Sequence, residues 1–336
     1  MNILVTGGLG YLGSHAVVEL IKQNYGVVIL DNLSNSHKKN LKRIEKITSQ
    51  KINFYKNDIR HKSMLHKILK DNNISGVMHF AGLKSVKKSN SQRKEYFDVN
   101  VNGTRNLIDV LNEINNDKKF FIFSSSACVY GNPSYLPYDE SHSLKPENFY
   151  GETKLESETL LKNTYLKHKG WNIVVLRYFN PIGSHHSYLI GDSPLGKPEN
   201  LMPNILNAVN SKEIALKIFG SDHDTLDGTP VRDYIHVEDL ICGHVVALNF
   251  LKKSKKDIYE IFNLGNGKGV SVLQLIKSFE DVNNVKVSFE FGEKRKGDLP
   301  KYFSSSEKIT KKIGWKPKLS VKDMCKSSWE FYKNNK

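Results

Sequence analysis

The first half of the chain repeats one pattern of hydrophobic and polar positions. A short apolar run is followed by a turn of small or polar residues, and then by a stretch with helical periodicity. In the first copy, Ile3, Leu4 and Val5 form the apolar run, glycines follow, and apolar side chains recur at helical spacing over 16–21. Short apolar runs bounded by turn residues predict buried strands, and a period near 3.6 predicts helices. Strands that alternate with helices predict an α/β fold built on a doubly wound parallel sheet.

The later segments extend this alternation into two domains. Further strands are predicted at 27–30, 52–55, 77–80, 120–123 and 173–176, and helices at 100–111 and from Tyr150 onward. Residues 181–203 are rich in Gly, Pro, Ser and His and have weak periodicity, which is typical of a loop-rich segment. We therefore place a domain boundary after Asn180 and expect a larger domain, 1–180, and a smaller α/β domain, 181–336. In the second domain we predict helices at 201–209, 236–251 and 270–279, and strands at 214–219 and 286–291.

The turn after the first predicted strand has the features of a dinucleotide-binding turn. Gly7, Gly10 and Gly13 allow a tight turn, close approach of a pyrophosphate to the backbone, and close packing of the helix on the strand. The N-terminus of the helix then faces the phosphates. The second predicted strand ends at Asp31, where a carboxylate accepts hydrogen bonds from the adenosine ribose and repels a 2′-phosphate. The pattern predicts a Rossmann-like first domain that binds NAD rather than NADP.

Later predicted strands also end in small or polar residues. Asp58 and Ile59 follow the third strand, where contact with the adenine ring is expected, and a turn at 80–84 follows the fourth. Ligands of open α/β sheets bind outside the carboxyl ends of the strands. These residues therefore predict one binding crevice along that edge of the sheet.

Tyr150 and Lys154 lie four residues apart at the start of a predicted helix, so both side chains leave the same face. A free phenol titrates near ~10, which is too high for a base at neutral pH. A nearby ammonium and the positive helix N-terminus both favour the phenolate, so we expect a lowered pKa for Tyr150. The strand before this helix leads into three serines at 124–126, and a hydroxyl there bridges the tyrosine to a substrate oxygen. The segment predicts a proton-transfer site.

Composition narrows the setting. The formal net charge is +15, but the lysines are spread along the chain without an arginine-rich stripe, so we expect no nucleic-acid partner. The chain starts with an apolar strand that lacks the features of a signal peptide, and no apolar stretch approaches the ~20 residues of a membrane span. Cys128, Cys242 and Cys325 have neither disulfide nor metal spacing. We expect a reducing, cytoplasmic setting without membrane contact.

His185 and His186 raise the question of a metal site. No carboxylate or cysteine lies at a ligand spacing from them in the sequence. We therefore expect two loop histidines and no metal.

Together with motifs in the second half, these features resemble the UDP-glucose 4-epimerases, a family of extended short-chain dehydrogenases/reductases. The resemblance covers nearly the whole chain. Besides Tyr150 and Lys154, it rests on ordered motifs at 6–15, 31–33, 79–84, 124–131, 176–181, 200–203, 231–237 and 297–300. It implies tightly bound NAD, a UDP-hexose substrate held by the second domain, and a homodimer that pairs the helix at 100–111 with the one from Tyr150.

The resemblance also assigns roles to single positions. It implies Ser126, Tyr150 and Lys154 as the catalytic set; Ser125 is the alternative serine, because the loop before Tyr150 is one residue shorter than the family pattern. The implied cofactor-binding residues are Gly7, Gly10, Tyr11, Leu12, Gly13, Asp31, Asn32, Asn35, Ser36, Asp58, Ile59, Phe80, Ala81, Gly82, Lys84, Asn100, Tyr150, Lys154 and Tyr178. The implied substrate-binding residues are Ser126, Tyr150, Asn180, Asn200, Leu201, Phe219, Arg232, Tyr234, Arg295, Asp298 and Tyr302.

The implied reaction interconverts UDP-glucose and UDP-galactose. Tyr150 takes the proton of the C4 hydroxyl while a hydride passes to NAD, the keto sugar turns over, and the hydride returns to its other face. Arg232 and Arg295 are suited to the diphosphate because their planar guanidinium groups match phosphate oxygens. The bulky Tyr302 is similar to family members that prefer UDP-glucose and UDP-galactose to N-acetylated sugars.

Other activities remain open at this point. A 4,6-dehydratase needs an Asp-Glu pair after the serine, where this chain has Ala127 and Cys128. A UDP-GlcNAc epimerase or a UDP-glucuronate decarboxylase is harder to exclude, and a non-enzymatic NAD- or polyanion-binding protein would leave the serine, tyrosine and lysine unused. The sequence does not determine the preferred direction, the tolerance of N-acetyl groups, the catalytic serine, the oligomeric state or the reason for the lysine excess.

Overall fold

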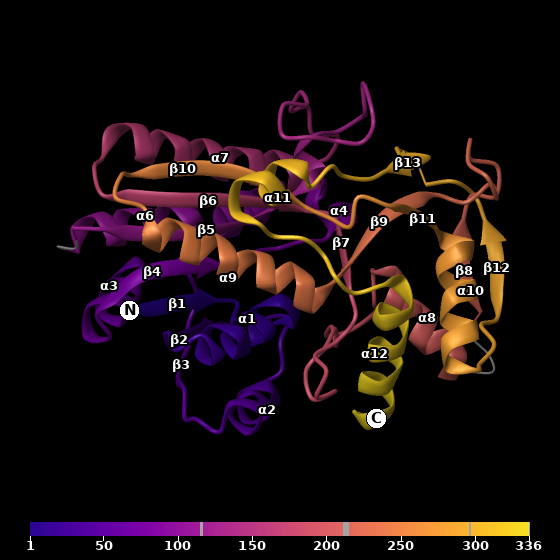
Figure 1. Ribbon diagram of the computed structural model, residues 1–336, viewed down its shortest axis with the longest axis horizontal. Coiled ribbons are helices and arrows are strands. Elements are labelled where there is room, and N and C mark those ends of the chain that lie inside the picture. The colour runs from indigo at the N-terminus through magenta and orange to yellow at the C-terminus, as the bar shows by residue number, and fades with distance from the viewer. Residues whose placement is uncertain (115–116, 211–214, 296, 336) are drawn as a thin grey trace.

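The computed structural model describes residues 1–114, 117–210, 215–295 and 297–335, and its largest element is a seven-stranded sheet (Figure 1). The strand order is β3-β2-β1-β4-β5-β6-β10, and every neighbouring pair is parallel. The strands are β1 (Asn2–Thr6), β2 (Gly26–Asp31), β3 (Asn53–Lys56), β4 (Ile74–His79), β5 (Lys119–Ser126), β6 (Trp171–Tyr178) and β10 (Ile258–Leu264). The doubly wound parallel sheet predicted from the sequence is confirmed.

Helices cover both faces of this sheet (Figure 1). One face carries α1 (Tyr11–Lys22), α2 (Lys39–Thr48) and α9 (Val237–Lys253), and the other carries α3 (Lys62–Asp71), α6 (Gly103–Glu113) and α7 (Phe149–Lys167). Successive strand residues point to opposite faces, so Val5 is buried in one core and Leu4 in the other. A strand that is buried on both faces must be apolar throughout, which explains the short apolar runs in the sequence.

The order of the strands reverses between β1 and β4, and this switch point positions the site. The two strands are tied at their carboxyl ends, where the Phe80 amide donates to the Thr6 carbonyl at 3.1 Å. The Thr6 hydroxyl also lies 2.7 Å from Nδ1 of His79. In such sheets the crevice for a ligand opens where neighbouring chains leave in opposite directions.

The rest of the chain forms smaller sheets and a third core. Strand β9 (Val231–His236) pairs with β7 (Asn180–Ile182), β11 (Gly269–Ser271) and β13 (Lys301–Tyr302), and β8 (Leu216–Phe219) pairs with β12 (Phe289–Gly292). Helices α8 (Leu201–Asn210), α10 (Val272–Asn283) and α12 (Val321–Asn334) pack around them, and α11 (Glu307–Ile313) follows β13. Shorter helical segments are α4 (Val86–Ser89), α5 (Arg93–Tyr96), a π-helical turn (Phe97–Asn102) and a 3-10 turn (Ala127–Val129).

Some predicted boundaries were wrong for identifiable reasons. The helix expected at 100–111 continues from a π-helical turn that begins at Phe97. The helix expected from Val270 begins at Val272, because 269–271 pair with β9. The strand expected at 286–291 is found as β12, which begins at Phe289 and ends at Gly292. The strand expected at 214–219 is found as β8, and residue 214 lies outside the described residues.

The sequence analysis did not identify β9 or β10. Strand β10 returns to the large sheet beside β6, and α9 packs against α1. The division of the chain at 180/181 stays a prediction. Residues 237–264, which include α9 and β10, pack with the large sheet although they follow that boundary. Within the described residues, no helix has both the length and the hydrophobicity that a membrane span requires.

Candidate active site

The glycine turn between β1 and α1 presents open backbone at the switch point. Gly7 has a φ of +67°, and a Cβ on it would lie 2.9 Å from the backbone nitrogen of Ala81. A Cβ on Gly13 would lie 2.1 Å from the carbonyl oxygen of Gly7. Gly10 directly precedes α1, whose N-terminal amides therefore face the turn. This is the shape that a dinucleotide pyrophosphate requires.

Asp31 organises the same turn from the end of β2. Its carboxylate accepts hydrogen bonds from the Leu9 amide at 3.0 Å, the Leu33 amide at 2.8 Å and the Ser36 hydroxyl at 2.7 Å. A carboxylate has about four acceptor positions, so Asp31 keeps capacity for a ribose hydroxyl while it holds the loop. Its structural role is larger than the sequence indicated.

Asp58 and Asn32 form the next part of the crevice. The Asn32 amide donates to Asp58 at 2.8 Å, and the Arg60 Nε donates to the same carboxylate at 2.9 Å. Burial alone would raise the pKa of Asp58, but the hydrogen bonds from Arg60 and Asn32 outweigh it and lower the pKa to about 2. Ile59 is buried against Gly103, where a Cβ would lie 2.4 Å from its side chain.

The turn at 80–84 is held by Asn100. The Leu83 amide donates to the Asn100 side chain at 2.8 Å, and that side chain donates to the Leu83 carbonyl and to the Thr153 hydroxyl, both at 3.0 Å. A Cβ on Gly82 would lie 3.8 Å from Nζ of Lys154, which places the turn beside the predicted catalytic residues. Asn100 thus connects the cofactor side of the crevice to α7.

The other predicted cofactor residues border the crevice. The Tyr11 hydroxyl donates to the Gly183 carbonyl at 2.8 Å, and the Asn35 side chain accepts from the Leu195 amide at 3.1 Å. Tyr178 ends β6 opposite Ser126, and Lys84 is exposed.

The predicted catalytic residues meet where β5 ends and α7 begins. Asn148 caps α7 by accepting from the Gly151 amide at 2.9 Å, and this cap fixes the first turn. Lys154 is 6% exposed, its Nζ donates to the Ser124 carbonyl at 2.9 Å, and it lies 5.9 Å from the centre of the Tyr150 ring. The spacing inferred from the sequence therefore brings both side chains to one place.

The expected lowering of the Tyr150 pKa is wrong for the protein chain alone. Desolvation by the surrounding side chains raises this pKa well above its usual range, and the hydrogen bond with Ser126 opposes the rise without cancelling it. Burial also lowers the pKa of Lys154 to about 8. The amine of Lys154 is hydrogen-bonded to the Ser124 carbonyl rather than to the phenol, so it acts on Tyr150 only as a nearby charge and does not offset the burial.

The geometry favours Ser126 over Ser125. Ser126 caps the 3-10 turn by accepting from the Cys128 amide at 3.2 Å, and its hydroxyl is near enough to Tyr150 to lower the pKa of that phenol against burial. Ser125 is fully buried and donates to Glu158 at 2.5 Å, so its hydroxyl is engaged by a carboxylate. The catalytic role of Ser126 stays a prediction.

Arg232, a predicted substrate residue, lies on β9 and is fixed by hydrogen bonds and an ion pair. Its guanidinium donates to the carbonyls of Val231 and Leu299, both at 2.8 Å, and pairs with Asp298. It is therefore held by the loop before β13, and 16% of its side chain is exposed.

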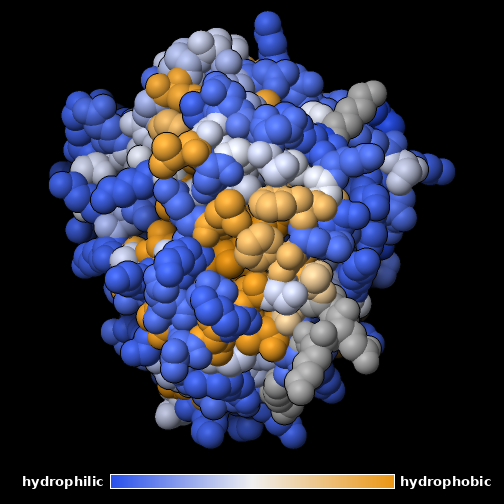
Figure 2. Space-filling view, turned by 90° about the vertical axis from the view of Figure 1, so that its right-hand side faces the viewer, coloured by the Kyte–Doolittle hydropathy of each residue, from blue (hydrophilic) through white to orange (hydrophobic). Residues whose placement is uncertain are grey.

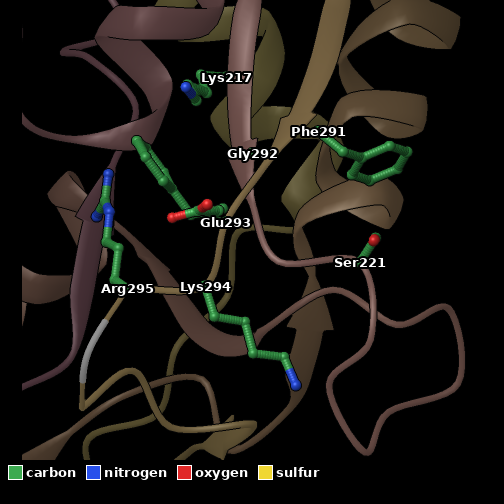
Figure 3. A pocket seen from close by; sticks show the side chains of 8 residues that line it. Lys217, Ser221, Phe291, Gly292, Glu293, Lys294 and Arg295 are labelled. Atoms are coloured by element: carbon green, nitrogen blue, oxygen red, sulfur yellow. The ribbon is translucent and has the colours of Figure 1, made fainter.

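A cavity of about 680 Å³ lies between β8, β12 and the segment that follows β12 (Figure 3). The Arg295 guanidinium lies 3.9 Å from the centre of the Phe219 ring, which leaves a flat, cationic wall. This volume is within the range of small-ligand sites. The lining residues are Lys217, Phe219, Ser221, Phe291, Gly292, Glu293, Lys294 and Arg295.

The end of the molecule beside this cavity carries a hydrophobic patch surrounded by hydrophilic side chains. Figure 2 shows hydrophobic side chains gathered on the face that carries α10, β8 and β12 in Figure 1. Phe289 and Phe291 on β12 are both exposed, and their rings meet edge to face at 5.8 Å.

Tyr302, a predicted substrate residue on β13, packs against two other aromatic rings. Its ring lies 5.1 Å from both the Tyr138 and Phe179 rings, and its hydroxyl is buried without a hydrogen-bond partner in the described structure. Desolvation raises its pKa well above the usual range. A neutral donor that lacks a partner is suited to a ligand oxygen.

The remaining predicted substrate residues are spread over three elements. Asn180 pairs with the buried Tyr234 across β7 and β9, and Leu201 begins α8. The Asn200 side chain lies 3.4 Å from Asp192.

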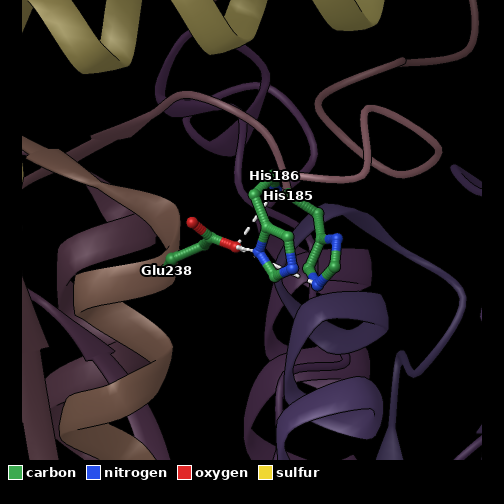
Figure 4. Close-up of side chains that lie close together, drawn as sticks. All are labelled: His185, His186 and Glu238. Atoms are coloured by element: carbon green, nitrogen blue, oxygen red, sulfur yellow. Dashed lines mark hydrogen bonds and ion pairs between the residues drawn. The ribbon is translucent and has the colours of Figure 1, made fainter. Parts of the chain in front are cut away.

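The structure brings His185 and His186 together with Glu238 (Figure 4). Nδ1 of His186 lies 2.6 Å from the carboxylate, and Nε2 of His185 lies 3.9 Å from it. The sequence analysis missed this carboxylate because it is 52 residues away. The ligand atoms of these three residues lie within 4.8 Å of one another, and Nζ of Lys22 lies 3.4 Å from Nε2 of His185, so an ammonium occupies space beside the cluster where a cation would compete with it.

Glu158 and Arg177 are partners that the sequence analysis overlooked. They form a buried ion pair directly behind the serines, with the Arg177 side chain 1% and the Glu158 side chain 4% exposed. The signal in the sequence was the spacing, since Glu158 lies one further helical turn from Lys154.

A glycine cradle, an acidic residue after β2, and a Ser–Tyr–Lys set after β5 on one parallel sheet define an NAD-binding protein of the short-chain dehydrogenase/reductase type. Residues 3–265 match the NAD dependent epimerase/dehydratase family, and the chain belongs to this family.

Known relatives are similar over almost the entire chain. It is 42% identical to a UDP-glucose 4-epimerase of Dictyostelium discoideum over 99% of this chain and 96% of the relative. A solved UDP-glucose 4-epimerase of Stenotrophomonas maltophila, with bound NAD and formylated UDP-arabinopyranose, superposes with a TM-score of 0.95 at 41% identity, covering 99% and 98% of the two chains. A Bifidobacterium longum enzyme with NAD+ and UDP gives a TM-score of 0.94 at 38% identity, covering 100% and 99%.

Proposed function

We propose that this protein interconverts UDP-glucose and UDP-galactose by transient oxidation at C4, with NAD held throughout the cycle. The observation that carries the proposal is the position of Tyr150. It lies beside Ser126 and Lys154 where β5 ends and α7 begins. The turn at 80–84 adjoins both Lys154, through Gly82, and the glycine turn, through Ala81 and Gly7. The full-length similarity to UDP-glucose 4-epimerases supports the same activity.

The residues around the crevice fit NAD. The open backbone at Gly7 and Gly13 would hold the pyrophosphate, Asp31 would hold the adenosine ribose, and Asn32 and Asp58 would hold the adenine end. When bound, NAD supplies a hydride acceptor and a positively charged ring. Asp31 disfavours a 2′-phosphate by like-charge repulsion, so NAD is preferred to NADP.

The chain itself handles the proton. Ser126 orients the C4 hydroxyl beside Tyr150, and Tyr150 must be ionised to take the proton at its phenolic oxygen. The positive ring of the bound cofactor and the Lys154 ammonium would favour the phenolate that burial alone disfavours. Tyr150 returns that proton when the sugar is reduced on its other face. Lys154 stays fixed on the Ser124 carbonyl and provides a positive charge near the ring.

The sugar must turn over while the nucleotide stays bound. Arg232 is held at its base by two backbone carbonyls, so it offers a fixed guanidinium to the diphosphate. The Arg295–Phe219 wall receives the uracil end. Tyr302 limits the space for substituents on the hexose, which favours UDP-glucose over N-acetylated sugars.

Elimination chemistry is disfavoured at this site. The position after the serine holds Ala127 and Cys128, and burial raises the pKa of the Cys128 thiol. A dehydratase needs an acid and a base there to expel and return water. Mass analysis of the product from UDP-galactose tests this: an isomer supports epimerisation, and loss of water or carbon dioxide contradicts it.

We also propose a homodimer in the cytoplasm. The π-helical turn and α7 expose Phe97 at 40% and Leu166 at 68%, and two copies that pair these helices would cover both side chains. The three cysteines are free, which suits a reducing compartment. Small-angle scattering with the mass of two chains supports the dimer, and the mass of one chain refutes it.

A further inference from the structure

A buried hydrogen-bond network includes Ser125, one of the three serines at the end of β5. Oε1 of Glu158 accepts from the Ser125 hydroxyl at 2.5 Å and from Nε of Arg177 at 3.0 Å, and Oε2 accepts from Nη2 of Arg177 at 2.5 Å. Nη1 of Arg177 donates to the Tyr130 hydroxyl at 3.2 Å, and that hydroxyl donates to Asn263 at 2.6 Å. The carboxylate is thus satisfied at both oxygens and cannot rotate freely.

This network meets Lys154 from two directions. Along α7, Glu158 lies one turn after Lys154 on the same buried face, and its charge opposes the desolvation of the ammonium. Along β5, Glu158 holds Ser125, and the preceding residue, Ser124, offers the carbonyl that accepts from Lys154. One carboxylate therefore controls both the charge and the anchor of the lysine.

The other titratable groups around Tyr150 and Lys154 are neutral near pH 7. Burial lowers the pKa of His79 on β4 to about 3, and burial raises the pKa values of Tyr178 on β6 and Cys128 after β5. Arg177 on β6 is the charged exception, and it is fixed in a bidentate pair with Glu158. Glu158 is the negative charge among these groups.

We propose that Glu158 is a positioning residue that keeps the Lys154 ammonium charged and aligned beside Tyr150. The proposal rests on the function proposed for the site. Its content is that Glu158 acts through Lys154 rather than only by holding α7 against the sheet. A purely structural pair would change stability and leave the titration of the site in place.

The first experiment compares the pH dependence of kcat for UDP-galactose conversion in the wild type, E158Q and E158D, between about pH 6 and pH 10. E158Q keeps the shape and removes the charge, so the decline of kcat at alkaline pH should begin roughly one pH unit lower, with little change in KM. E158D retains the charge and should restore the alkaline limb. An E158Q profile that superposes on the wild type overturns the proposal.

E158Q leaves the Arg177 charge buried without a partner, which destabilises folded proteins. The double variant E158Q/R177Q removes both charges, and it should still show a downward shift because the Glu158 charge raises the pKa of Lys154 against desolvation. The shift should be smaller than in E158Q, since the guanidinium no longer repels the ammonium. The matched control is E260Q. It removes a carboxylate of β10, the strand beside β6, and this carboxylate pairs with Lys308 of α11. The alkaline limb should stay in place in E260Q, and an equal shift there contradicts a specific role for Glu158.

A second measurement separates this proposal from the proposed function. The pKa of Lys154 is about 8 in the folded chain, below its ordinary value, so the unfolded chain binds more protons above about pH 8 and thermal stability gains a contribution as pH rises. In E158Q/R177Q this gain should begin at lower pH than in E260Q. If the wild type converts no UDP-galactose, the proposed function fails while this comparison still decides whether Glu158 acts on Lys154; an unchanged onset overturns the inference.

Discussion

Nζ of Lys154 donates a hydrogen bond to the backbone carbonyl of Ser124 at 2.9 Å, although the side chain starts one helical turn from Tyr150. The lysine is therefore anchored to β5, the strand that carries the predicted catalytic serine. It acts on the phenol as a fixed charge at a distance and not as a direct partner. This arrangement explains why burial dominates the pKa of Tyr150 in the protein alone.

Replacing Tyr150 with Phe should reduce kcat by roughly 10³-fold, because the ring stays in place while the group that moves the proton is lost. The content of bound NAD should not change, since the cradle at Gly7 and Asp31 is untouched. Turnover and NAD absorbance after denaturation measure the two effects. Tyr165→Phe, on the same helix with its hydroxyl 3.4 Å from the Asp257 carbonyl, is the control and should keep full activity. Undiminished turnover in Tyr150→Phe would refute the assignment of the base.

Replacing Arg232 with Lys should raise KM for UDP-galactose by roughly 10-fold or more, with a smaller effect on kcat. The ammonium keeps the charge but cannot reach both carbonyls and a phosphate with fixed donors. Steady-state kinetics checks this against Arg105→Lys, an exposed position on α6 that should behave as the wild type. A change in kcat alone would place Arg232 outside the diphosphate site.

Replacing Tyr302 with Ser should raise the ratio of kcat/KM for UDP-GlcNAc to that for UDP-glucose, by about 10-fold or more. The ring that packs between Tyr138 and Phe179 would be gone, and the space would admit an N-acetyl group. Competition assays with both sugars give the ratio directly. A wild-type enzyme that converts UDP-GlcNAc as fast as UDP-glucose would contradict the role of Tyr302.

Asp58 should contribute to acid sensitivity. Its pKa is about 2 in the folded chain, below its ordinary value, so the stabilisation is present above the ordinary value and is lost as the pH falls through about 2. Asp58→Asn should lack this part of the acid dependence. The effect is about 1 kcal/mol, because 39% of the Arg60 side chain is exposed to solvent. Thermal unfolding as a function of pH measures it, and Asp281→Asn, an exposed i,i+4 pair on α10, is the control. Identical acid profiles for Asp58→Asn and the wild type would contradict the prediction.

The sequence predicted the parts of the fold that local patterns determine. Buried parallel strands must be apolar throughout, so 27–30, 120–123 and 173–176 were recognisable. Strand β9 was not, because its register with β7, β11 and β13 depends on partners far along the chain. For the same reason, β10 could not be placed beside β6.

The predictions for the site divide in the same way, into features set by local spacing and features set by distant residues. The four-residue spacing of Tyr150 and Lys154 was readable, since helical geometry alone places the two side chains together. The direction of the Tyr150 pKa was not readable, because desolvation depends on every surrounding side chain. The carboxylate beside His186 was hidden by its distance in the sequence.

The most direct test is to denature the purified protein, quantify released NAD, and assay the native protein with UDP-galactose. We predict about one NAD per chain and a product with the mass of the substrate and the mobility of UDP-glucose. A chain without NAD that still turns over, or a product that has lost mass, would contradict the proposed function.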